Sequence, residues 1–193
     1  MTTKDKILDA ALRVFNRDGA MDTSTNHVAS EAGLSPGNLY YHFKNKEQIV
    51  RALFVRLDQR LDALFKLPDD HSLQFADLER LLHGNFTLLW QYRFFYRDQL
   101  ALLRRDPELR ALYRTQRQRG VEGTRALIAS FAASGVLRPL KDAQLEALAR
   151  VAYLISDFWL PSLELSDEPA TEASFQAAID TLRVVLEPFI VTA

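Results

Sequence analysis

In this 193-residue sequence, the segment from Ser35 to Phe43 places the strongest constraint on the fold. It indicates a helix that is too short and too polar to be a core helix. Ser35 is a favourable N-cap, and Pro36 follows at the first helical position, where its missing N–H costs nothing. Leu39 and Phe43, four residues apart, give the helix one narrow apolar stripe. Neighbouring helices must therefore support it through that stripe.

The outward-facing side chains of this helix predict contact with a polar, anionic partner. They are Gly37, Asn38, Tyr40, Tyr41 and His42, and Lys44 and Lys46 follow just beyond the helix. Asn side chains can bond base edges, whereas Tyr, His and Lys can bond phosphates. Double-stranded DNA is the expected partner, and a solvated surface without a partner is the alternative.

A second short helix precedes this one and completes a helix-turn-helix pattern. Thr23 or Ser24 is expected to cap it, and Val28 and Ala29 lie on its buried side. Gly33 then permits the turn into Ser35. Two short helices joined by a Gly-containing turn of three or four residues form the reading unit of many DNA-binding proteins.

The rest of the chain also has helical periodicity, without strand-like alternation, so an all-α fold is expected. Pro68-Asp69-Asp70 is the clearest break, Asp98 is expected to cap a short helix, and Gly120 and Gly123 are expected to kink a long helix or permit close contact. The expected helices cover residues 4–17 (capped by Thr3), 45–65, 73–92, 99–105, 106–133, 143–160 and 172–190.

Composition narrows the classes of function. The chain has no cysteine, which excludes disulfides and thiolate metal sites, and its four His residues lack metal-ligand spacing, so no metal or cofactor is expected. No apolar run is long enough to span a membrane, and the charged N-terminus does not resemble a signal peptide, so a cytoplasmic protein is expected. The motifs of common enzyme classes are missing, so we expect no enzyme.

Charge is segregated although the net charge is only −1. Residues 93–119 carry eight Arg against three acids, whereas residues 142–187 carry two Arg against nine acids. The Arg-rich stretch is most simply a solvated helix face. DNA contact is therefore expected from a local patch near the reading helix, and not from bulk charge.

The N-terminal quarter resembles the TetR family of transcriptional repressors in Thr23-Ser24, Val28-Ala29, Ala32 to Ser35 and Gly37 to Glu47. This resemblance implies an all-α homodimer with a helix-turn-helix DNA-binding domain at residues 1–48 and an effector-binding and dimerisation domain at residues 49–193. It also implies the DNA-contacting residues. Backbone contacts fall on Tyr40, His42 and Lys46, base contacts on Asn26 and Asn38, and neighbouring positions on Thr25, Ser35, Gly37, Tyr41 and Lys44.

The resemblance also gives a reason to expect a ligand pocket and a dimer face in the second domain, although core packing explains the same apolar residues. Candidate pocket residues are Phe86, Trp90, Arg93, Tyr96, Tyr153 and Asp157, which favour a largely apolar ligand with one polar end. Candidate dimer residues are Leu148, Ala152, Ile155, Trp159, Ile179, Leu182, Leu186 and Phe189.

The expected function is that of a homodimeric repressor which a small molecule releases from a palindromic operator. Two alternatives stay open. The protein can be a constitutive or activating DNA-binding regulator without a small-molecule ligand, which a body without a cavity would favour. It can also be a helical carrier or enzyme that contains the motif, which turnover or lack of DNA binding would favour.

Overall fold

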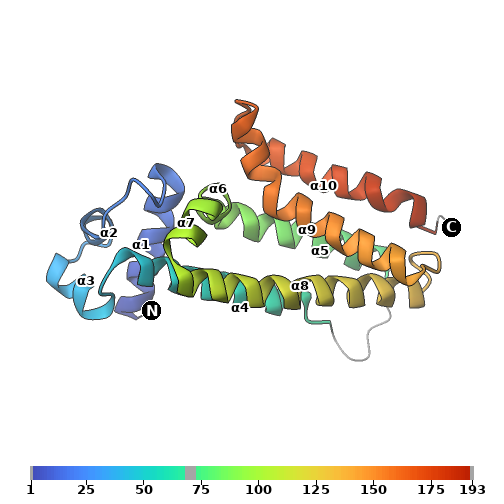
Figure 1. The fold of residues 1–193 in the computed structure, drawn as a ribbon, viewed down its shortest axis with the longest axis horizontal. Coiled ribbons are helices and arrows are strands. Elements are labelled where there is room, and N and C mark those ends of the chain that lie inside the picture. Colours follow the sequence, from blue (N-terminus) through green and yellow to red (C-terminus); the bar gives the residue numbers. More distant parts are fainter. Residues whose placement is uncertain (1, 68–72, 192–193) are drawn as a thin grey trace. The chain divides into compact units, whose positions relative to one another are not determined.

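The structure, a computed structural model, describes residues 2–67 and 73–191, and within them it is helical (Figure 1). Apart from one antiparallel bridge between Leu137 and Ile190, these residues contain no β-structure. The helices are α1 (Thr3–Asp18), α2 (Thr25–Glu31), α3 (Pro36–His42), α4 (Lys46–Phe65), α5 (Phe75–Gln91), α6 (Arg93–Arg97), α7 (Gln99–Arg105), α8 (Pro107–Ala133), α9 (Asp142–Leu165), α10 (Glu172–Leu186) and the 3₁₀ helix η1 (Glu187–Phe189).

The described residues form two compact units, each made of two segments of the chain. The first unit comprises Met1–Leu61 and Gln91–Leu112, and the second comprises Asp62–Trp90 and Tyr113–Ala193. The helices α4 and α8 each continue from one unit into the other. The helix-turn-helix therefore shares its unit with most of α4, with α6 and α7, and with the start of α8.

The core of the first unit holds α3 in place. α1 packs on α2 and on α6, and α2 packs on α3. Leu39 of α3 is completely buried, and Phe43 directly after the helix is 3% exposed, as the expected docking stripe requires. Phe15 of α1 and Phe94 of α6 contact each other with ring centroids 5.3 Å apart. The α6 residues thus extend the core beneath the N-terminal helices.

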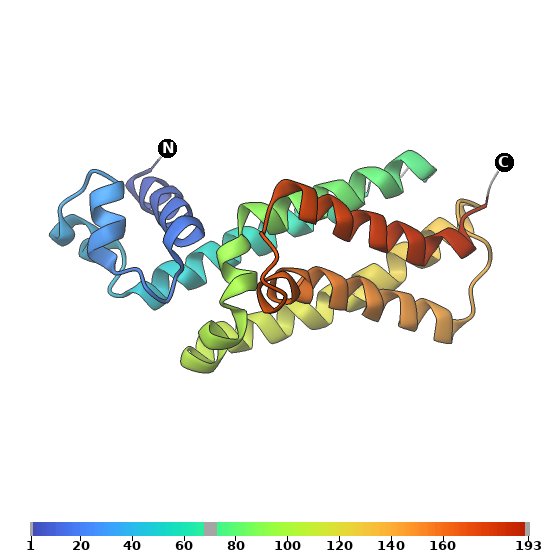
Figure 2. The same ribbon diagram turned by 90° about the horizontal axis from the view of Figure 1, so that it is seen from above.

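The second unit has its own core, formed by α5, α8, α9 and the end of α10. Its buried members are Leu73, Leu78, Leu81, Ile128, Phe131, Leu137, Leu145, Leu148, Ala149 and Leu186. α9 and α10 pack on each other along this core. Figure 2 shows these two helices side by side, as does Figure 1. Burial of these apolar side chains stabilises the second unit.

Most expected helices are confirmed, with shifts at their ends. The N-cap of α1 is Thr2 and not Thr3, because the Thr2 hydroxyl accepts the Asp5 N–H in a capping box. α5 begins at Phe75 instead of residue 73. α10 ends at Leu186, and its expected last turn is the 3₁₀ helix η1. The expected break at Pro68-Asp69-Asp70 lies outside the described residues.

The largest correction concerns Pro161, before which α9 was expected to end. The helix continues through it to Leu165. A proline in a helix removes one hydrogen bond and crowds the preceding turn, which bends the helix without always ending it. Figures 1 and 2 show the last turns of α9 bent away from the direction of the turns before them.

The two glycines of α8 have different surroundings. α8 is a single helix from Pro107 to Ala133, so neither glycine interrupts it. At Gly120, a side chain would overlap the hydroxyl and ring of Tyr153 on α9. At Gly123, a Cβ would meet nothing within 4 Å. Gly120 therefore permits the close contact that was expected as one possibility, whereas Gly123 does not.

This difference predicts opposite effects of two alanine substitutions. Gly123→Ala should raise the free energy of unfolding by about 1 kcal/mol, because alanine favours the helix. Gly120→Ala should lower it by about 1–3 kcal/mol, because Tyr153 must leave its position. Denaturant unfolding of both variants tests this, and equal stabilisation by the two substitutions would contradict the close packing of Tyr153.

Candidate functional site

The local sequence of α3 explains how it forms at the surface. The Ser35 hydroxyl accepts the N–H of Asn38 at 3.2 Å, and Pro36 occupies the first turn. Gly33 has a positive φ of 63°, which turns the chain between α2 and α3. α2 starts with a capping box in which Ser24 and His27 exchange hydrogen bonds. Of the two expected caps for this helix, Ser24 is therefore the one used.

The side chains expected to contact DNA are mostly on the surface of the first unit. Ser35, Gly37 and Asn38 are exposed, as are Asn26 on α2 and Lys44 after α3. Tyr40 and Tyr41 are 43% and 79% exposed, which is high for aromatic side chains. His42 is half-buried, and its ring meets the Tyr41 ring edge-on with centroids 5.2 Å apart.

Polar contacts fix part of this surface. The hydroxyls of Thr25 and Tyr40 are hydrogen-bonded at 3.1 Å, which joins the start of α2 to α3. The Lys44 ammonium donates to the Tyr40 carbonyl at 3.1 Å. Lys4 of α1 lies 5.6 Å from the centroid of the Phe43 ring, which brings another cation beside α3. The sequence analysis did not single out Lys4, because its neighbour is 39 positions away in the chain.

Lys46 differs from the other candidates. Its ammonium donates to the carbonyls of Ala20, Met21 and Thr23, at 2.5, 3.0 and 2.7 Å. These three bonds use all the donors of a lysine. Burial lowers the pKa of Lys46, and nearby Arg105 acts in the same direction. The side chain expected to contact the DNA backbone is thus engaged by the α1–α2 loop.

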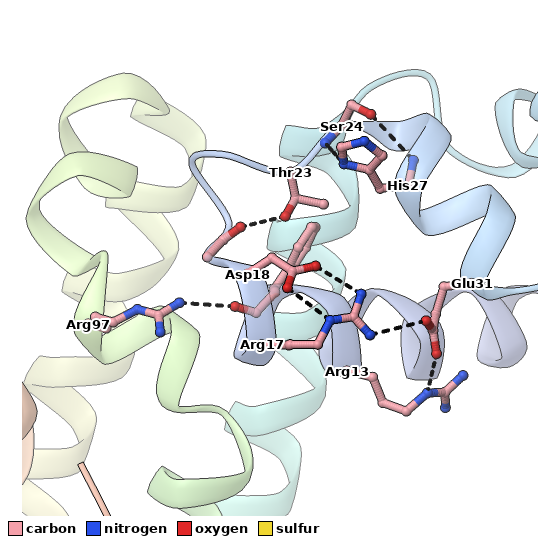
Figure 3. Close-up of polar contacts among 10 residues, drawn as sticks. Arg13, Arg17, Asp18, Thr23, Ser24, His27, Glu31 and Arg97 are labelled. Carbon is pink, nitrogen blue, oxygen red and sulfur yellow. Dashed lines mark hydrogen bonds and ion pairs between the residues drawn. The ribbon is translucent and has the colours of Figure 1, made fainter. Parts of the chain in front are cut away.

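Ion pairs join α1 to α2 on another side of the same unit (Figure 3). Glu31 accepts from Arg13 at 2.9 Å and lies 3.5 Å from Arg17, which also bonds Asp18 at 2.8 Å. The hydrogen bond from Arg13 is the main cause that lowers the pKa of Glu31. Because acids pair both arginines, this side offers little net positive charge to a phosphate.

The six candidate pocket residues are divided between the two units. Arg93 and Tyr96 lie on α6 in the first unit, whereas the other four lie in the second. Phe86 and Trp90 contact Phe175, with ring centroids 6.2 and 4.9 Å apart, and Phe86 is 1% exposed. Phe86 therefore lies in the core of its unit. This agrees with the alternative interpretation, in which these apolar residues pack in a core.

Tyr153 and Asp157 are brought together with two residues that the sequence analysis missed. Asp157 is 5% exposed and accepts the Tyr113 hydroxyl at 2.8 Å. Arg117 lies 3.6 Å from the same carboxylate oxygen and stacks over the Tyr153 ring at 5.6 Å. Arg117 belongs to the Arg-rich stretch that was interpreted as a solvated face, and the available signal was its position four residues after Tyr113, on the same face of α8.

Four of the expected dimer residues are buried within the chain itself. Leu148, Ile179, Leu182 and Leu186 are each less than 9% exposed. Trp159 donates its indole N–H to the Ser174 carbonyl at 2.7 Å, and Ala152, Ile155 and Phe189 are half-buried. Leu148 and Leu186 belong to the core of the second unit, and Phe189 packs against it. The large apolar side chains that are exposed on α9 and α10 are others, namely Leu154, Phe158, Leu165 and Val184.

Other kinds of site find no support in the part of the chain that the structure describes. Across residues 2–67 and 73–191, His, Asp and Glu side chains form no group that could hold a metal ion. In the same residues, no helix has the length and apolar character needed to cross a membrane.

Two family profiles match the chain, one for each part. The profile described as "Bacterial regulatory proteins, tetR family" covers residues 7–53. The profile described as "Bacterial transcriptional repressor", which is the TetR profile, covers residues 56–193. The second match alone spans more than half of the sequence, and the first contains the helix-turn-helix.

Curated relatives match over part of their length. The regulator UidR of Escherichia coli is 32% identical over 75 residues, which are 39% of this chain and 38% of UidR. The repressor NicS of Pseudomonas putida is 28% identical over 142 residues, which are 73% of this chain and 62% of NicS. The matched segments thus span less than two thirds of these relatives.

Solved structures match over nearly the whole chain. A TetR-family transcriptional regulator from Marinobacter aquaeolei has a TM-score of 0.89 and 32% identity, covering 99% of this chain and 92% of its own. The SmeT–triclosan complex has a TM-score of 0.67 and 20% identity, covering 100% and 94%. At that identity, the likeness to SmeT concerns the fold alone.

The buried Asp157 predicts a pH-dependent stability. Burial is the main cause that raises the pKa of Asp157 above its ordinary value of 3.8 in the folded chain, and the hydrogen bond from Tyr113 and the positive charge of Arg117 only partly oppose it. Its contribution to stability is therefore full below the unfolded pKa and is lost as the pH rises through the folded pKa. Asp157→Asn retains an oxygen for Tyr113 without this titration.

The free energy of unfolding of the wild type should thus fall relative to Asp157→Asn as the pH rises from 4 to 8. Denaturant unfolding across this range measures the difference, with Glu168→Gln as the control, because that acid is exposed. Parallel pH profiles of wild type and Asp157→Asn would show that Arg117 fully compensates the buried charge.

Proposed function

The chain belongs to the TetR family of bacterial transcriptional regulators, and we propose that it acts as a homodimeric repressor that a small molecule releases from a palindromic operator. As a member of this family it is a DNA-binding regulator and not an enzyme. The protein would bind its operator in the cytoplasm. The helix that would read the DNA sequence is α3.

The observation that carries the proposal is the exposed face of α3. Asn38 is positioned in the first turn, where side chains of a recognition helix reach base edges. Tyr40 and Lys44 flank it and can bond phosphates, which set the register on the duplex. Tyr41 is 79% exposed and its ring contacts only the edge of His42 among the ring contacts described, so burial in a core does not explain an aromatic residue at this position.

The proposed dimer face consists of the exposed apolar side chains of α9 and α10. On α9, Leu154, Phe158 and Leu165 are 51%, 41% and 88% exposed and recur at helical spacing. On α10, Val184 is 64% exposed. Because α9 and α10 pack on each other, these residues can form one patch, and such exposed patches favour association. A two-fold dimer implies a palindromic operator.

The effector is proposed to be recognised within the second unit. Its aromatic residues Trp90 and Tyr153 suit an apolar ligand, and the cluster of Tyr113, Arg117 and Asp157 offers polar contacts. SmeT, which shares the fold, binds triclosan in its solved complex. The proposed ligand is small and largely apolar, with one polar end that the cluster of Tyr113, Arg117 and Asp157 would contact.

Release would follow from a population shift. DNA selects dimers whose two α3 helices are about 34–36 Å apart, one turn of the double helix. A ligand that binds better to a dimer with another spacing shifts the population away from DNA. The continuous helices α4 and α8 belong to both units, so they are the natural elements to transmit this change.

Selection of bound sequences from a random duplex pool tests the proposed operator binding. The wild type should recover a palindrome, and Asn38→Ala should recover sites with relaxed preference at one or two positions, losing about 1–3 kcal/mol of discrimination at each. His83→Ala is a control, because His83 lies on α5. Unchanged base preference in Asn38→Ala would remove Asn38 from the reading residues, and recovery of a site without two-fold symmetry would contradict the palindrome.

The dimer face predicts the oligomeric state of two variants. Leu154→Glu and Val184→Glu should each convert the dimer to monomers and weaken operator binding, because a buried charge at the interface is costly. Leu100→Glu is the control, since Leu100 is 59% exposed but lies on α7. Sedimentation velocity measures the state, and a dimer that persists in both variants would contradict this face.

A further inference from the structure

The α1–α2 loop is held by charged side chains from two other elements of the first unit. Lys46, the first residue of α4, donates to the carbonyls of Ala20, Met21 and Thr23. Asp98, between α6 and α7, accepts the N–H of Ala20 at 3.0 Å. The Ala20 residue is thus bonded on both sides, by a cation through its carbonyl and by an anion through its amide.

Asp98 was expected to cap α7, and the structure corrects this. It occupies the N-cap position of α7, but its side chain makes no capping hydrogen bond there. Its carboxylate reaches the Ala20 amide, 78 positions earlier in the chain. The neighbouring residue Arg97 also bonds this part of the chain, because it donates to the Phe15 carbonyl near the end of α1 (Figure 3). The α6–α7 joint therefore binds the end of α1 and the loop after it.

A short path connects this loop to the DNA-contacting surface. Thr23, whose carbonyl Lys46 binds, directly precedes the N-cap of α2, Ser24. Thr25 then begins α2 and is hydrogen-bonded to Tyr40 of α3. Thr23 itself is 3% exposed and donates to the Gly19 carbonyl at 2.6 Å, which closes the loop. A displacement of the loop therefore displaces the start of α2 and, through it, Tyr40.

We propose that Lys46 and Asp98 are positioning residues for DNA binding, which hold the Ala20–Thr23 loop and thereby set how α2 and α3 present their side chains to DNA. This inference rests on the proposed operator binding and changes the role of one residue in it. Lys46 acts through the loop, whereas Lys44, whose side chain is exposed, is left as the cation that reaches the phosphate.

The chemistry of the two side chains supports this role. A lysine ammonium is a compact cation with three donors, which matches three converging carbonyls, whereas the planar guanidinium of arginine does not. An ammonium whose three N–H groups are already bonded to carbonyls has no free donor for a phosphate oxygen. Asp98 carries a negative charge, which repels phosphates. If Asp98 acted only through this charge, its removal would strengthen DNA binding. A loss of affinity on its removal therefore separates positioning from charge.

The experiment measures operator affinity against salt concentration for the wild type, Lys46→Met, Lys46→Arg and Asp98→Ala. Measurements are made at a temperature where circular dichroism shows each variant fully folded. Lys46→Met should weaken binding about tenfold or more, because three carbonyls lose their donor, with the salt slope unchanged. Lys46→Arg should fail to restore affinity, and Asp98→Ala should also weaken binding. Hydrogen exchange of the free protein should quicken at residues 20–25 in Lys46→Met and Asp98→Ala.

Lys44→Met and Lys44→Arg provide the matched controls. A direct phosphate contact should lower the salt slope by roughly 0.9 in Lys44→Met, and Lys44→Arg should retain affinity. The same pattern at Lys46, with a lower slope and rescue by arginine, would overturn the positioning role. Tighter binding by Asp98→Ala, or unchanged exchange at residues 20–25, would overturn it as well. A wild type that binds no duplex would instead refute the operator binding on which the inference rests, while the exchange data would still report on the loop.

Discussion

The reading helix α3 has only seven residues, and a helix of that length does not persist alone in water. Its conformation and position therefore depend on what surrounds it. Leu39 and Phe43 anchor one side of it in the core, Ser35 caps its start, and Tyr40 is bonded to α2. The position of the face proposed to contact DNA thus depends on α2 and on the loop before α2.

Local chemistry made much of this predictable from the sequence. The Ser35-Pro36 and Asp106-Pro107 pairs each mark a helix start, because a cap and a proline act through adjacent backbone groups. The all-α fold followed from periodicity in the same way, whereas the short helix α6 was not expected. The exposed face of α3 was predictable because two apolar residues leave the rest of so short a helix to solvent.

Contacts between distant parts of the chain were not predictable in this way. Lys46 bonds carbonyls 23 to 26 positions earlier, and Asp98 bonds an amide 78 positions earlier. On α9 and α10, spacing identified apolar stripes but not which of two stripes faces the core, so Leu182 was expected outside although it is buried. The expected end of α9 at residue 160 was also wrong, because the helix continues through Pro161 to Leu165, and a proline can bend a helix without ending it.

The helix α4 connects these observations, because it has anchors in both units. In the first unit, Lys46 at its start holds the α1–α2 loop. In the second, Asp62 near its end pairs with Arg119 at 3.3 Å, and Leu64 packs so closely on Gly84 that a side chain there would overlap it. Because Lys46 is the first residue of α4, a movement of the start of α4 would shift its ammonium relative to the three carbonyls. Three short hydrogen bonds tolerate little displacement, so under the proposed positioning role α4 is the element through which a change at its other end would act on α2 and α3.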